Sequence, residues 1–198
     1  MEPFRRHRGR MAPLDRANVD TDQIIPKQFL KRIERSGFGP FLFHDWRRAD
    51  PDFVLNRPEY QGATILVAGP NFGCGSSREH AAWSIQDAGF KAVIAPSFGD
   101  IFATNALEIG LLPVRLPETS VRRLLELARE DPMAEVSVDL EAQTVTAEGF
   151  AEGFEIDPFA RDCLLNGWDK VALTLRHEPD IAAYEGRRAT WLPRVTAS

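Results

Sequence analysis

The feature that most constrains the fold is a strand, a glycine-rich turn and a helix start that follow one another between residues 63 and 88. Residues 63–68 (Ala-Thr-Ile-Leu-Val-Ala) are apolar and bounded by glycines, which predicts a short buried strand. Gly73 and Gly75 then allow tight backbone turns. The series Ser76-Ser77-Arg78-Glu79 has the pattern of a capping box, which predicts that a helix begins here. A helix N-terminus flanked by two hydroxyls and a guanidinium predicts a site for an anion such as a carboxylate.

Better-known glycine motifs do not fit this turn. A dinucleotide-binding fingerprint would need a third glycine where Arg78 stands, and an acid at the end of the next strand, which instead ends Ile-Ala-Pro-Ser at residues 94–97. The Gly-Lys-Ser/Thr of a phosphate-binding loop and the Gly-x-Ser-x-Gly of a hydrolase are missing as well. Cys74 is interpreted as a small residue in a turn rather than as a thiol nucleophile, since no other signal supports covalent chemistry.

Strand and helix patterns alternate along the rest of the chain. They predict an α/β fold with a mainly parallel central sheet flanked by helices, and an additional β-hairpin. The expected strands are 10–14, 63–68, 91–95 and 111–116, with the hairpin at 136–140 and 144–147. The expected helices are 79–88, 99–109, 117–129 and a short one from Pro158 to about Gly167. With 198 residues and 43% hydrophobic content, the chain is expected to form one domain over residues 1–198.

Composition argues against several functional classes. A net charge of −5 argues against a nucleic-acid partner or an anionic membrane surface. The two cysteines are too few for a disulfide-stapled secreted fold or for an iron–sulfur cluster. No apolar stretch approaches the length of a membrane span, so we expect a cytoplasmic protein. The basic run at residues 5–10 is expected to be a solvated terminus or a partner-facing segment.

The aromatic-rich segment at residues 37–58 is too long for an ordinary connection. Long ordered loops in compact domains tend to be functional or interfacial. Its aromatic cluster, residues 38–46, is therefore expected to be exposed and to dock a partner.

Three separated motifs resemble the swivelling C-terminal domain of the aconitase superfamily. They are Asn-Val-Asp-Thr-Asp-Gln-Ile-Ile-Pro at 18–26, Gly-Ser-Ser-Arg-Glu-His-Ala-Ala at 75–82, and Pro-Ser-Phe-Gly-Asp-Ile-Phe-Ala-Thr-Asn at 96–105, followed by Gly-Leu-Leu-Pro at 110–113. With the chain length, the aromatic segment and the tail at 184–193, the chain is most similar to the bacterial small subunits of 3-isopropylmalate dehydratase. The resemblance covers nearly the whole sequence and implies an aconitase-type swivelling β/β/α domain.

The resemblance also implies an activity and a partner. The implied reaction is a hydro-lyase isomerisation of 2-isopropylmalate and 3-isopropylmalate through 2-isopropylmaleate, a step of leucine biosynthesis. In that family a [4Fe-4S] cluster is bound by a separate large subunit, and the open iron of the cluster holds the substrate hydroxyl. This chain would therefore bind no cofactor itself and would be active only as part of a heterodimer or larger assembly, on a 2-hydroxy dicarboxylate substrate.

The same resemblance implies roles for six residues. Ser76 would be the catalytic base, acting as an alkoxide, while Ser77 and Arg78 would bind a substrate carboxylate. Phe29, Leu30 and Lys31 match the position of the family's substrate-recognition loop. A serine is normally a very poor base, so positive potential from Arg78 and the helix N-terminus would be needed to stabilise the alkoxide.

Alternatives remain open on the sequence alone. Ser76 could serve only as a helix N-cap, a role that many helices need. The chain could be the small subunit of a related hydro-lyase, such as homoaconitase or a methylmalate/citraconate hydratase. If Lys31 rather than Leu30 faces the substrate, a tricarboxylate substrate could be accepted, which would favour this alternative. A third possibility, from another class, is a non-catalytic anion-binding regulatory module.

Overall fold

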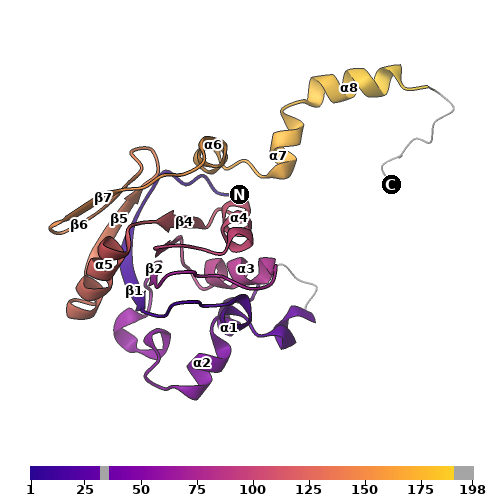
Figure 1. Cartoon of the computed structure of the whole chain (residues 1–198). Coiled ribbons are helices and arrows are strands. Elements are labelled where there is room, and N and C mark those ends of the chain that lie inside the picture. Colours follow the sequence, from indigo (N-terminus) through magenta and orange to yellow (C-terminus); the bar gives the residue numbers. More distant parts are fainter. Residues whose placement is uncertain (32–35, 190–198) are drawn as a thin grey trace.

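The computed structural model describes residues 1–31 and 36–189, and within them seven strands form one sheet in the order β4-β3-β2-β1-β5-β6-β7 (Figure 1). β1 to β4 pair in parallel, whereas β5 runs antiparallel to β1 and continues into an antiparallel meander with β6 and β7. The strands are β1 (Arg6–Leu14), β2 (Ile65–Ala68), β3 (Ala92–Ala95), β4 (Leu112–Arg115), β5 (Glu135–Asp139), β6 (Thr144–Ala147) and β7 (Phe150–Gly153). The predicted α/β class is confirmed, and β7 adds a strand that the hairpin prediction missed.

Helices connect the strands and extend beyond them at the C-terminal end. The α-helices are α1 (Thr21–Ile24), α2 (His44–Ala49), α3 (Glu79–Asp87), α4 (Asp100–Ile109), α5 (Glu118–Glu130), α6 (Pro158–Asn166), α7 (Lys170–Leu175) and α8 (Glu178–Arg187). Four 3₁₀ turns are η1 (Lys27–Lys31), η2 (Gly39–Phe41), η3 (Val54–Asn56) and η4 (Pro58–Tyr60). Among the described residues, no helix combines the length and apolarity that a membrane crossing requires.

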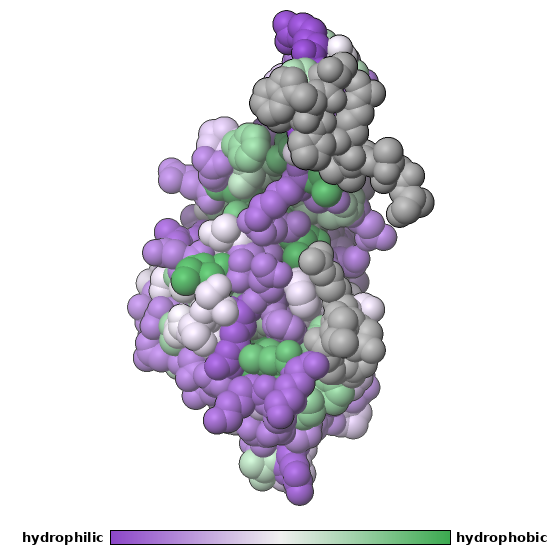
Figure 2. Space-filling view, turned by 90° about the vertical axis from the view of Figure 1, so that its right-hand side faces the viewer, coloured by the Kyte–Doolittle hydropathy of each residue, from purple (hydrophilic) through white to green (hydrophobic). Residues whose placement is uncertain are grey.

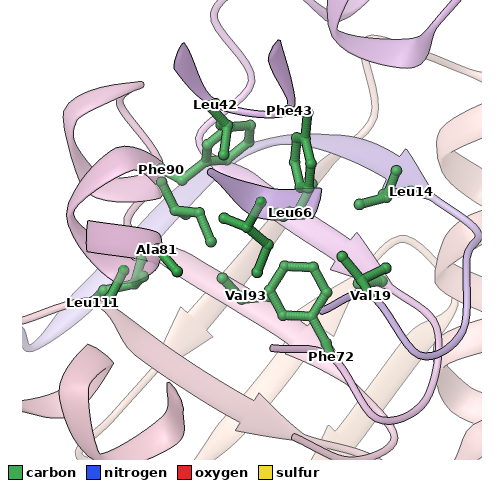
Figure 3. Packing of buried hydrophobic residues seen from close by; sticks show 14 of the residues in the cluster. Leu14, Val19, Leu42, Phe43, Leu66, Phe72, Ala81, Phe90, Val93 and Leu111 are labelled. Atoms are coloured by element: carbon green, nitrogen blue, oxygen red, sulfur yellow. The ribbon is translucent and has the colours of Figure 1, made fainter. Parts of the chain in front are cut away.

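The strands β2 and β3 are buried on both faces, and their successive side chains point into opposite cores. Leu66 and Val93 point into one core, which α3 and α4 cover, and Figure 3 shows this packing. Ile65 and Val67 point into a second core on the other face, which α5 covers together with residues of β5 to β7. The two cores fix the sheet between helical layers, so the loops after the parallel strands start from a rigid edge.

The aromatic segment is part of the first core, so the predicted exposure of its cluster is wrong, while the predicted docking role stays a prediction. Phe38, Leu42 and Phe43 are fully buried, and Figure 3 shows Leu42 and Phe43 over Leu66. Trp46 stacks on Phe43 with ring centroids 5.4 Å apart, and Phe53 meets the same ring edge-on. The segment has only short helical turns of its own, and its rings supply the apolar cover that a longer helix would otherwise provide.

The basic run near the N-terminus forms the first half of β1, so it is an ordered strand rather than only a solvated terminus, and a partner-facing role stays a prediction. Arg6 pairs with Asp139 and Arg10 with Glu135 in the register with β5. The side chains of Arg6 and Arg8 remain exposed, and Arg8 forms an ion pair with Glu135 at 2.7 Å. Because side chains alternate along a strand, Arg6, Arg8 and Arg10 share one face of β1, while Gly9 and Met11 on the other face are buried.

Candidate active site

The glycine turn leaves β2 at the carboxyl edge of the parallel sheet, and its two serines precede the helix rather than cap it. α3 begins at Glu79 with Arg78 in the N-cap position, and the Arg78 side chain makes no capping hydrogen bond. The predicted capping box at residues 76–79 is therefore wrong, and so is the interpretation of Ser76 as an N-cap. Ser76 and Ser77 are both exposed, so the hydroxyl of Ser76 is not taken up by the helix end.

A capping box does occur in this region, but one strand earlier. Asp20 caps α1 by accepting a hydrogen bond from the Gln23 backbone at 2.7 Å, and the Gln23 side chain accepts one from the Asp20 backbone at 3.0 Å. This arrangement satisfies two amides at the start of a very short helix. The capping box fixes the geometry of the Asp-Thr-Asp run, residues 20–22, in the connection that follows β1.

The Asp-Thr-Asp segment holds the serine turn directly. Asp20 and Cys74 form an isolated parallel bridge, and the Thr21 amide donates to the Cys74 carbonyl at 3.0 Å. The Thr21 hydroxyl donates to the Ser76 carbonyl at 2.9 Å and lies 3.4 Å from Ser76 Oγ. The turn that carries Ser76 is thus positioned by backbone and hydroxyl contacts from the end of the neighbouring strand.

Asp22 forms an ion pair with Arg78 through Nη1 of the guanidinium. The Arg78 side chain is 16% exposed, whereas that of Asp22 is 55% exposed. A guanidinium has five N–H donors in a planar fork, so pairing through one nitrogen leaves donors for a second carboxylate. Thr21 and Asp22 belong to a motif that the sequence singled out, but no role was assigned to either. The adjacency of β1 and β2 in a parallel sheet was the signal that could have found them.

The third motif, residues 96–105, packs against the serine turn from the side opposite to Thr21. The Gly99 amide donates to the Phe72 carbonyl at 2.9 Å, and Phe72 bridges Phe98. A Cβ placed on Gly99 would lie 2.5 Å from the Gly73 carbonyl oxygen, so only glycine allows this approach. Gly73 itself has a φ of +73° and faces the Phe102 ring. The three motifs, which follow β1, β2 and β3, therefore meet at one edge of the sheet.

His80 follows Arg78 on the first turn of α3 and lies between two aromatic rings. Its ring centroid is 5.1 Å from that of Phe38 and 4.7 Å from that of Trp83. Burial lowers the pKa of His80 below its ordinary value, Arg78 lowers it further, and Glu79 opposes the shift. The lowered pKa disfavours the protonated imidazole, which would place a second cation beside the guanidinium.

The predicted substrate-recognition residues lie in η1, after α1. Phe29 stacks on Phe41 with centroids 4.2 Å apart and meets His44 edge-on at 4.9 Å. Leu30 is half-buried against the first core, and Lys31 is exposed. These contacts hold η1 on the aromatic segment rather than on the serine turn. Contact of Phe29, Leu30 or Lys31 with a substrate remains a prediction.

The residues of this chain do not fit an iron–sulfur cluster. Such clusters are held by several thiolates, and the chain has two cysteines. Cys74 is half-buried in the serine turn, while Cys163 is buried on α6, where burial raises the pKa of its thiol. Among residues 1–31 and 36–189, no group of three or more His, Cys, Asp or Glu side chains is arranged to hold a metal ion.

Comparison with known families matches the whole arrangement. Residues 1–119 match the family model described as the aconitase C-terminal domain, which includes all three motifs. Residues 122–158 match a model described as LeuD_N, and residues 171–198 match a model of the C-terminal domain of the 3-isopropylmalate dehydratase small subunit. The sequence-derived resemblance is confirmed in each part of the chain that these models cover.

Curated relatives and a solved structure agree. A 3-isopropylmalate dehydratase small subunit of Rubrobacter xylanophilus is 61% identical over 195 residues, covering 98% of this chain and 100% of the relative. The protein of the same name from Geobacillus kaustophilus is 59% identical, covering 94% of this chain and 98% of the relative. The crystal structure of 3-isopropylmalate dehydratase (leuD) from Methanocaldococcus jannaschii has a TM-score of 0.66 and 30% identity, covering 91% of this chain and 99% of that one. The chain therefore belongs to the family of 3-isopropylmalate dehydratase small subunits.

Proposed function

We propose that this chain is the small subunit of a cytoplasmic 3-isopropylmalate dehydratase, a hydro-lyase of leucine biosynthesis. It interconverts 2-isopropylmalate and 3-isopropylmalate through 2-isopropylmaleate, together with a large iron–sulfur subunit. The observation that carries the proposal is the meeting of three motifs around an exposed Ser76 hydroxyl that no helix end engages. Membership of the small-subunit family supports the same reaction class.

Ser76 moves the proton in this proposal. As an alkoxide it takes the proton from the carbon beside the one that carries the hydroxyl, the hydroxyl leaves, and a double bond forms between the two carbons. Addition of water in the opposite sense, with Ser76 returning the proton, gives the isomer. Positive potential from Arg78 and from the start of α3 favours the alkoxide over the neutral hydroxyl. Thr21 holds the Ser76 turn, which fixes the direction of the hydroxyl.

Arg78 binds a substrate carboxylate, and Ser77 assists it. The planar fork of Arg78 suits a carboxylate, and the ion pair with Asp22 restrains the guanidinium before substrate arrives. A group that is already oriented loses less entropy on binding. The lowered pKa of His80 disfavours a second cation beside the guanidinium.

The chain supplies no cluster ligands in this proposal, since its two cysteines lie on different elements. The cluster is assigned to the large subunit, and the site is complete only in the assembly. Phe29, Leu30 and Lys31 are assigned to recognition of the third substrate substituent. Leu30 favours an apolar isopropyl group over a charged arm because an unpaired carboxylate against leucine would cost several kcal/mol.

Reconstitution tests the proposal. The purified chain is mixed with its cognate large subunit under anaerobic conditions and assayed on 3-isopropylmalate, citrate, homocitrate and citramalate, with each subunit alone as control. Activity on isopropylmalate only when both subunits are present is expected. A preference for homocitrate or citramalate would contradict the substrate assignment, and full activity of either subunit alone would contradict the two-subunit site.

A further inference from the structure

Exposed apolar side chains are concentrated at one end of the molecule. Among the described residues, seven large hydrophobic side chains are exposed, and five of them lie on α6, α7 and α8. Their exposed fractions run from 36% to 66%, and they are Phe159, Val171, Leu175, Ile181 and Tyr184. Such a concentration on three short consecutive helices is typical of an interaction site rather than of scattered surface residues.

The helices α7 and α8 project from the body of the protein (Figure 1). Every residue of α8 is exposed. Figure 2 looks at the side from which these helices project, and on the body of the protein it shows green apolar groups between purple polar ones. An isolated helix of ten residues is marginal in water, because the cost of its first turn is not repaid over so short a length. Contacts with the rest of the chain or with a partner must therefore supply most of the stability of α8.

This surface is continuous with the candidate active site through α4. Ile101, a sixth exposed hydrophobic residue, lies on the first turn of α4, two positions after Gly99, which touches the serine turn. Glu108 lies at the other end of the helix and forms an ion pair with Lys170 of α7 at 2.7 Å. Because positions 101, 104, 105 and 108 share one helix face, that face leads from the serine turn to α7.

An apolar groove lies at the junction of α4, α6 and α7. Its volume is about 300 Å³. The apolar residues that line it are Met1, Leu107, Phe159, Ala160, Cys163, Trp168 and Leu173. A groove of this kind beside exposed apolar side chains offers a pocket for an anchoring residue of a partner.

We propose that Ile101, Phe159, Val171, Leu175, Ile181 and Tyr184, here called the α4–α8 surface, dock the large subunit of the dehydratase. This inference rests on the proposed function, since it identifies where the partner of that reaction binds. The partner has to close over the serine turn, and the α4 face leads from that turn to α7 and α8.

The family matches favour the large subunit over a second copy of this chain. Residues 1–119 match a domain described as the C-terminal part of aconitase, whereas residues 171–198 match a module described as belonging to the small subunit. A domain that is linked covalently to its neighbour stays at a high effective concentration near it. A separate subunit lacks this link, so a larger interface affinity is needed to keep it bound. Four of the six exposed side chains lie in the small-subunit module, namely Val171, Leu175, Ile181 and Tyr184.

The test compares two variants in the full chain. Val171→Asp/Leu175→Asp places charges on the α4–α8 surface, while Met133→Asp changes the one exposed large hydrophobic residue, among those described, that lies outside it. We expect the Kd for the large subunit to rise at least about 100-fold in the double variant, since losing each buried side chain costs at least tenfold. Met133→Asp should stay within about threefold of the unmodified chain. The maximal rate at saturating large subunit should be unchanged in both.

A second double variant distinguishes loss of the docking surface from local unfolding of α7. Ile181→Asp/Tyr184→Asp on α8 should weaken the same assembly, with circular dichroism and the melting temperature of the body unchanged. An unaltered Kd in both double variants would overturn the proposal. Loss of self-association with an unaltered large-subunit Kd would overturn it in favour of a second copy. If the unmodified pair assembles but is inactive on isopropylmalate, the proposed function fails, and the Kd values still decide the docking surface.

Discussion

Replacing Gly99 by alanine tests how tightly the serine turn must be held. Gly99 has φ −63° and ψ 132°, a conformation open to every residue, so alanine brings no backbone strain. Its Cβ, however, would lie 2.5 Å from the Gly73 carbonyl oxygen and 3.0 Å from Cys74 Cα. Restoring an ordinary contact of 3.4 Å requires the start of α4 and the turn to separate by about 0.9 Å.

That displacement has two measurable consequences. Both neighbours are backbone atoms two or three residues before Ser76, so the shift is transmitted to the hydroxyl. A misplacement of about 1 Å costs up to about 10²-fold in rate, and overpacking costs about 1–3 kcal/mol of stability. We therefore expect a 10- to 100-fold lower kcat with saturating large subunit, and a lower melting temperature of the isolated chain.

Steady-state kinetics of the assembled enzyme measure the first effect, and thermal unfolding measures the second. Gly153→Ala is the matched control, because its Cβ would meet only the Gln143 carbonyl, at an ordinary 3.8 Å. That control should keep its kcat. A folded Gly99→Ala enzyme with the kcat of the unmodified enzyme would refute the argument that the α4 contact positions the serine turn.

Three further changes separate binding, specificity and pH dependence. Asp22→Asn should raise KM about 3- to 10-fold with a smaller change in kcat. It should cost less than about 1 kcal/mol of stability, because the ion pair is partly exposed. A lower KM in steady-state kinetics would show that Asp22 competes with the substrate. Leu30→Arg should lower kcat/KM for isopropylmalate and raise it for homocitrate. Burial of the isopropyl group contributes up to about 2.4 kcal/mol at about 0.8 kcal/mol per CH₂. An unaltered ratio of the two kcat/KM values would show that η1 does not set specificity. Burial lowers the pKa of His80 in the folded state, so the unfolded chain binds more protons and stability falls as the pH drops through the ordinary value of 6.5. Urea unfolding at pH 7 and pH 5 should therefore show that His80→Gln loses less stability between the two pH values than the unmodified chain. Equal losses of stability would contradict the assignment.

Local patterns predicted the parallel half of the sheet well. The runs at 63–68 and 91–95 contain the fully buried strands β2 and β3, because strands covered on both faces have continuous apolar sequences. The run at 111–116 contains the edge strand β4, in which Leu112 and Val114 are buried. The helix that ends before Gly110 is also confirmed, and that glycine adopts the left-handed conformation expected after a helix. These features depend on residues close in sequence.

Features that depend on distant residues were not predictable in the same way. Phe43 is buried because the face of the sheet around Leu66 needs cover, which the sequence of its own segment does not reveal. The pairing of Asp22 with Arg78 requires knowledge that β1 lies beside β2. The capping pattern at Ser76 failed because the turn is held by Thr21 and Gly99, which keeps it out of the helix.

The kcat of Ser76→Ala in the assembled enzyme tests the central claim most directly. The variant removes only a hydroxyl on an exposed residue, so folding and subunit assembly should be unaffected. We predict that kcat on 3-isopropylmalate falls by about 10²- to 10⁴-fold, the usual contribution of a positioned acid or base, with a smaller change in KM. A Ser76→Ala enzyme that assembles normally and keeps the turnover of the unmodified enzyme would contradict the account.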